Sequence, residues 1–86
     1  MYSYHDVENI KINLEWIVHQ TTTSNHSPTN HDQKVILSLL TLIQTYETLL
    51  QLIDQYGVSV IDTEIAEGLS VTEKFIVKVK RNAGSM

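Results

Sequence analysis

The feature that most constrains the fold is a long apolar repeat in the middle of the chain, over residues 31–56. Apolar side chains recur there at alternating steps of four and three residues, with a second apolar row beside the first. The repeat predicts one α-helix, and a helix so apolar around its circumference must be covered on more than one side. We therefore expect a central core helix, capped by Asn30 and stopped by Gly57, that also forms part of a dimer interface. The main row is Val35, Leu39, Leu42, Tyr46, Leu49, Ile53 and Tyr56, and the second is Ile36, Leu40, Ile43 and Leu50.

A first helix is predicted over residues 4–20. Ser3 and Asp6 have the spacing of a capping pair at a helix start. The apolar positions that follow form a narrow stripe, which suits packing against one neighbouring helix. The stripe consists of Val7, Ile10, Leu14 and Ile17, and the outer face carries Glu8, Lys11 and Glu15. Trp16 lies beside the stripe, and the sequence leaves open whether it anchors a partner or joins the core.

The segment 21–30 is rich in small polar residues and holds the only proline, so it is predicted to be a loop. It is long for a connection between helices, which indicates either a spacer or a mobile functional loop. The whole chain, residues 1–86, is short enough to form a single domain.

Composition narrows the classes of function. The chain has no cysteine, no glycine-rich phosphate loop and no apolar run of the length that a membrane span needs, so we expect a cytoplasmic protein without a membrane segment. Its acids are scattered over predicted outer faces, so we expect no enzyme and no cofactor. Four histidines lack the helical spacing that favours a metal site, so none is predicted there; they are His5, His19, His26 and His31.

The formal net charge of −4 conceals an uneven distribution. Residues 1–71 hold nine acids against two lysines, whereas residues 72–86 hold four cations against a single acid, Glu73. Any contact with phosphate groups is therefore expected at the C-terminal end of the chain.

Residues 62–82 have the apolar spacing of a helix-turn-helix. In such a motif a small residue such as Ala66 allows two short helices to cross, and the turn Leu69-Ser70-Val71 buries Val71 beneath it. Thr72 would cap the second helix, which returns apolar side chains to the core and leaves another face for the major groove of DNA. The apolar positions concerned are Ile65, Ala66, Leu69, Val71, Phe75, Ile76 and Val79.

This stretch resembles the helix-turn-helix regulators, and the run EIAEGL is similar to the E-I-A-x-x-L segment that precedes the recognition helix in LuxR-type and sigma-factor families. One departure is Ser70, which stands at the turn position most often occupied by glycine. The resemblance implies a sequence-specific regulator that binds double-stranded DNA as a homodimer. It would place Thr72 and Glu73 at base edges, Lys78 and Arg81 at phosphates or a guanine, and Lys80 at a flanking phosphate. The rest of the exposed recognition face would be Lys74 and Val77.

Two alternatives stay open. The β-branched residues within 75–80 also fit a strand, for which 58–61 is the only candidate partner. The cations of the C-terminal end can also serve only to solvate a helix end and complement its dipole. The chain would then be a helical interaction module, an inhibitor or adaptor, that binds another protein through its two acidic helices.

Overall fold

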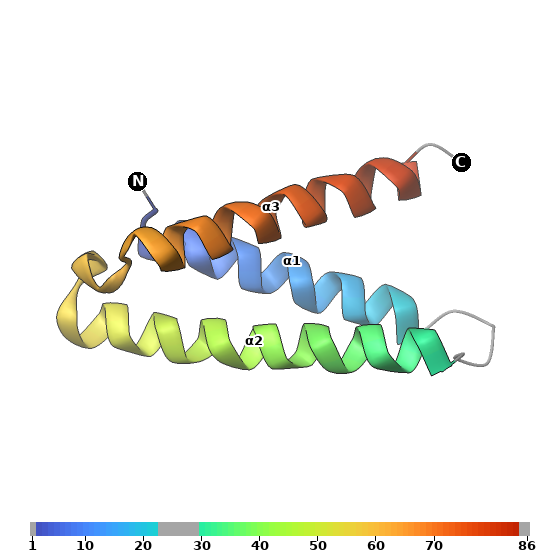
Figure 1. Cartoon of the computed structure of the whole chain (residues 1–86), viewed down its shortest axis with the longest axis horizontal. Helices are drawn as coiled ribbons and strands as arrows, with labels where there is room; N and C mark the ends of the chain where they lie inside the picture. Colours follow the sequence, from blue (N-terminus) through green and yellow to red (C-terminus); the bar gives the residue numbers. More distant parts are fainter. Residues whose placement is uncertain (1, 23–29, 85–86) are drawn as a thin grey trace.

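A computed structural model describes residues 2–22 and 30–84, and within these ranges every regular element is helical (Figure 1). This confirms the all-α fold class. The two predicted long helices differ from the observed ones by at most two residues at either end. The predicted 21–30 loop falls largely outside the described residues, although Thr21 and Thr22 continue the first helix. The elements are α1 (Tyr4–Thr22), α2 (Asn30–Tyr56), the 3-10 turn η1 (Val58–Val60) and α3 (Thr63–Gly84).

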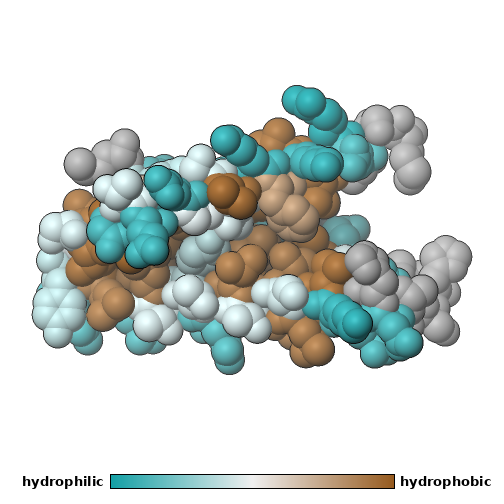
Figure 2. All heavy atoms as spheres, in the orientation of Figure 1, coloured by the Kyte–Doolittle hydropathy of each residue, from teal (hydrophilic) through white to brown (hydrophobic). Residues whose placement is uncertain are grey.

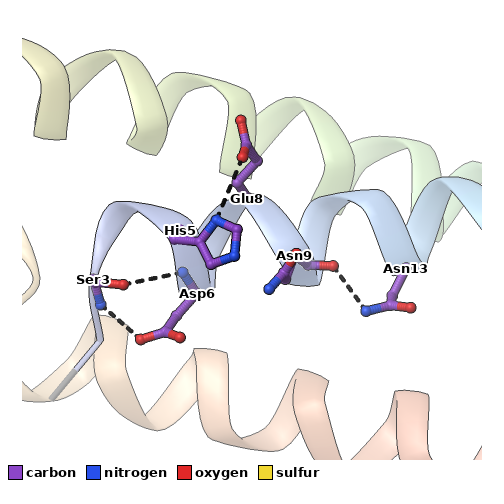
Figure 3. Close-up of polar contacts among 6 residues, drawn as sticks. All are labelled: Ser3, His5, Asp6, Glu8, Asn9 and Asn13. Atoms are coloured by element: carbon purple, nitrogen blue, oxygen red, sulfur yellow. Dashed lines mark hydrogen bonds and ion pairs between the residues drawn. The ribbon is translucent and has the colours of Figure 1, made fainter.

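The start of α1 is fixed by a reciprocal pair of hydrogen bonds. The Ser3 backbone N–H donates to Asp6 Oδ2 at 2.9 Å, and the Asp6 backbone N–H donates to Ser3 Oγ at 3.2 Å (Figure 3). The predicted capping pair is therefore confirmed. The Ser3 backbone N–H contributes most to lowering the pKa of the Asp6 carboxyl, and the Ser3 hydroxyl lowers it further, because both stabilise the charged carboxylate.

The junction between α2 and α3 depends on a glycine and an aspartate. Gly57 has φ of +90°, a backbone conformation that side chains with a Cβ rarely adopt, and its N–H donates to the Ile53 carbonyl at 2.7 Å. After η1, Asp62 Oδ1 accepts a hydrogen bond of 2.8 Å from the Ile65 N–H and so caps α3. The predicted stop of the long helix at Gly57 is confirmed, and α3 begins at the start of the stretch 62–82 that was expected to be helical.

The core is built around α1, which packs against both α2 and α3. Its predicted apolar stripe is buried throughout, and Val7 and Leu14 are fully enclosed together with Leu69 of α3. The outer-face prediction is wrong for Lys11, because its ammonium group lies 3.7 Å from Glu47 of α2 as well as 3.4 Å from Glu15. Lys11 therefore links α1 to α2.

The predicted turn at residues 69–71 is wrong in this structure, because α3 continues through it without a break. A turn there needs a residue that tolerates positive φ, and the only described residue with positive φ is Gly57. Ser70 stays helical, and Val71 is 67% exposed instead of buried beneath a turn. The strand alternative for residues 75–80 is also wrong, since they lie within the same helix.

The backbones of α2 and α3 approach each other less closely than either approaches α1. In Figure 1 the two helices diverge from the end that η1 joins, and α1 runs behind them. Contrary to the expectation from the sequence, the stretch Asp32–Tyr56 is apolar and long enough to cross a membrane by length and composition, as many core helices are. Only 33% of its most apolar part is buried. The fold therefore leaves much of the apolar surface of α2 uncovered.

Candidate docking groove and cationic face

An open apolar groove runs between α2 and α3, on the side away from α1. It consists of two hollows of about 540 and 470 Å³ that share Leu42 as a lining residue, and all described lining residues come from α2 and α3. We call this surface the α2–α3 groove. Figure 2 shows hydrophobic side chains gathered between the two helices on this face. Its main apolar walls are Val35, Leu42, Leu49 and Leu52 from α2, and Val71 and Phe75 from α3.

One hydrogen-bond chain lies in the floor of the groove. The Thr72 hydroxyl donates to the Gly68 carbonyl at 2.9 Å, and the Tyr46 hydroxyl lies 2.7 Å from Thr72 Oγ1, where it can donate to that oxygen. Both side chains are buried, and no described buried side-chain polar atom lacks a partner. The floor therefore offers an occupant no unsatisfied polar group, and contact with it is mainly apolar.

The wall residues of α3 are more exposed than apolar core residues. Val71 is 67% exposed and Phe75 is 38% exposed, although Val71 was predicted to be buried beneath a turn and Phe75 to return to the core. Ile76, on the α1 side of the same helix, is buried as predicted. Because α3 turns one apolar side toward α1 and another toward the open groove, it has apolar surface that the described fold does not cover.

A second surface of α3 collects most of the predicted DNA-contacting side chains. Lys74, Val77, Lys78 and Arg81 are exposed and line one shallow hollow together with Ser70 and Glu73. We call this surface the cationic face. Its lysines and arginine follow at steps of four and three residues, so a single continuous helix brings them together without any turn.

Three predicted site residues do not fit the proposed contacts with DNA. Thr72 is 7% exposed and bonded to Tyr46, so it neither caps a recognition helix nor reaches a base edge. Lys80 points away from the cationic face, because its ammonium group lies 5.8 Å from the centre of the Trp16 ring on α1. Glu73 Oε1 accepts a hydrogen bond from the Tyr2 hydroxyl.

The contact between Tyr2 and Glu73 ties the start of the chain to the middle of α3. The hydrogen bond to the carboxylate stabilises the neutral phenol, and it is the main reason why the pKa of Tyr2 is raised. Sequence reasoning missed this contact because the two residues are 71 positions apart. No local pattern marks such a pair.

Histidines and acids do not converge on a metal-binding arrangement among the residues that the structure describes. His5 lies 3.9 Å from Glu8 along the exposed side of α1 (Figure 3), while His26 and the His31 side chain lie outside the described part.

Comparison of the chain with protein families, with curated proteins and with solved structures finds no match.

Proposed function

We propose that this protein is a helical interaction module that binds an amphipathic helix of another polypeptide in the α2–α3 groove. The observation that carries the proposal is the open apolar lining between two helices whose backbones both pack closely on α1 but not on each other. Between Lys34 and Leu52 the groove follows α2 for about 27 Å at 1.5 Å per residue, which is the length of about five helical turns.

The chemistry of the lining defines the partner. A helix that fits would carry apolar side chains at steps of three and four residues, the pattern by which helices dock in grooves. Full burial of an apolar side chain contributes about 1.5–3 kcal/mol, so the exposed parts of Val71 and Phe75 offer a substantial share of the affinity. Ser38, Thr45 and Thr48 are the small lining residues on the α2 side, and they leave room for a close approach.

Selection from a displayed library of amphipathic helices, at nanomolar protein concentration, tests this function. Val71→Glu places a charge in the groove and should abolish binding of the selected helices. Val77→Glu is the matched control, since it makes the same change on the same helix at a residue that is 56% exposed on the cationic face. Equal binding by both variants, or selected helices that bind neither variant, would contradict a site in the groove.

A second candidate function is sequence-specific DNA binding by a homodimer, as expected of a small transcriptional regulator. The specific observation in its favour is the cationic face, where Lys74, Lys78 and Arg81 lie exposed in one row. A row of three cations on one helix suits phosphate oxygens of a nucleic acid. Because no turn separates a recognition helix, α3 would have to enter the groove of DNA as one long helix.

Fluorescence anisotropy with mixed duplex fragments at rising salt tests the second candidate. Lys78→Ala and Arg81→Ala should each lower affinity and make the salt dependence shallower, because each removes a phosphate contact. Lys34→Ala is the control for charge. Lys11→Ala is unsuitable, because it removes ion pairs with Glu15 and Glu47. If Lys78→Ala, Arg81→Ala and Lys34→Ala all lost the same amount of affinity, binding would depend on net charge alone and not on the cationic face.

A further inference from the structure

We propose that the occupant of the α2–α3 groove is a second copy of this chain, related by a two-fold axis so that the two grooves meet face to face and antiparallel. This inference rests on the proposed function, because it names the polypeptide surface that covers the groove. It also gives the expected homodimer a defined interface and orientation.

The two ends of the groove carry opposite charges. Lys34 lines the end of the groove where α2 begins, in the same hollow as Phe75. On α3, Glu67 precedes the wall residue Val71 by four positions and Lys78 follows it by seven, so all three lie along one side of the helix. The rim of the groove is therefore acidic near the start of α3 and basic near its end.

These rim charges have no ion-pair partner within the described ranges. Glu67, Lys78 and Lys34 are exposed, and the described ion pairs involve only α1 and Glu47 of α2. A rim without internal partners is free to pair across an interface. Such pairs contribute orientation and specificity more than raw affinity.

Two face-to-face arrangements have two-fold symmetry, and the charges distinguish them. An axis parallel to the groove would place the basic ends of both copies together. Repulsion between the like charges disfavours that arrangement. An axis that lies in the plane of the interface and crosses the groove at a right angle sets α3 against α3 and α2 against α2, with each pair antiparallel. The basic end of each copy then meets the acidic end of the other.

The Tyr46–Thr72 hydrogen bond fixes which parts of α2 and α3 lie level with each other. A two-fold axis near this level places Glu67 of one copy opposite Lys78 of the other, twice per dimer, because both are about equally far from Thr72 along α3. It also brings Lys34 toward the C-terminal end of α2 in the second copy. That last turn has no basic residue of its own to complement the helix dipole.

The groove offers a long apolar surface for a second copy to cover. A specific interface removes about 800 Å² from each partner. The groove follows α2 for about 27 Å at 1.5 Å per residue, and its apolar wall residues Leu52, Val71 and Phe75 are 39%, 67% and 38% exposed. Apolar side chains are therefore open to a partner along the length of the groove.

Sedimentation of the full chain at micromolar concentrations, with charge-reversed variants, tests the arrangement. The wild type should have a sedimentation mass of about twice the 9.8 kDa of one chain. Glu67→Lys and Lys78→Glu should each raise the dimer dissociation constant about tenfold, because each turns two attractive contacts into repulsive ones. The double variant, whose net charge equals that of the wild type, should restore dimerisation. Circular dichroism of each variant checks that the helices remain folded.

The outcomes separate this inference from the proposed function. A wild-type monomer, or a dimer that neither reversal weakens, overturns the antiparallel second copy. In that event binding of the displayed helices still decides whether the groove receives another polypeptide. Flotation with phosphatidylcholine–phosphatidylglycerol vesicles covers the lipid alternative, since binding by a monomer that Val71→Glu abolishes would assign the groove to a membrane surface. Loss of dimerisation in Val71→Glu but not in Val77→Glu supports the second copy.

Discussion

The Tyr46 hydroxyl and the Thr72 hydroxyl lie 2.7 Å apart in the floor of the α2–α3 groove, and they join two helices whose backbones make few close contacts. Thr72 also donates to the Gly68 carbonyl, so its oxygen is left to accept the Tyr46 proton. The pair therefore acts as a polar link at the point where α2 and α3 would otherwise touch only through apolar side chains.

Removal of this link should destabilise the fold by a modest amount. Tyr46→Phe deletes one buried hydrogen bond and should lower the free energy of unfolding by about 1 kcal/mol. Thr72→Val should cost a similar amount, and the double variant should cost less than the sum because both changes remove one shared interaction. Urea denaturation measures all three. Strictly additive costs would show that the two hydroxyls do not interact.

The same pair shows where sequence reasoning reached its limit. Local signals were read correctly: the capping pair of Ser3 and Asp6, the stop at Gly57 and the apolar stripe of α1 all depend on neighbours within one or two helical turns. The prediction for Thr72 is wrong because a threonine after an expected turn fits a helix cap as well as it fits a mid-helix hydroxyl bonded one turn back. Only the tertiary contact with Tyr46 decides between the two.

The groove was missed for a related reason. Val71 and Phe75 have the spacing of core residues. The apolar pattern of a helix indicates which side is apolar, but it does not indicate whether another element covers that side. The cationic face could be predicted because Lys74, Lys78 and Arg81 lie together on any continuous helix. Lys80 could not be placed in the same way, because its position over Trp16 depends on how α1 and α3 cross.

The cap of α1 predicts a loss of stability on acidification. The pKa of Asp6 is lowered in the folded state by the Ser3 N–H and hydroxyl, so its contribution is complete above the unfolded pKa of about 3.9 and disappears as pH falls through the lower folded pKa. Asp6→Asn should flatten this part of the curve of unfolding free energy against pH. Ser3→Ala should cost about 1 kcal/mol at neutral pH. If Asp6→Asn lost stability on acidification as much as the wild type does, the loss would come from other carboxylates and not from the cap.

Gly57 tests the junction between α2 and η1. Its φ of +90° is unfavourable for any residue with a Cβ, while no neighbouring atom lies within 4 Å of where that Cβ would be. Gly57→Ala should therefore lower the free energy of unfolding by about 1 kcal/mol through backbone strain alone. Thermal unfolding followed by circular dichroism would reveal it, and a gain in stability would contradict the positive φ.

Gly68 gives the opposite expectation and tests whether α3 is continuous. It lies in the interior of α3 with no positive φ, and a Cβ there would meet nothing within 4 Å. Gly68→Ala should therefore raise the free energy of unfolding by about 0.5–1 kcal/mol, since alanine loses less conformational freedom than glycine in a helix. In a helix-turn-helix that used Gly68 to enter its turn with positive φ, the same change would be destabilising. Urea denaturation measures the sign of the change in stability, which distinguishes one long helix from two short ones. A loss of stability would contradict the continuous helix and favour a turn near Gly68.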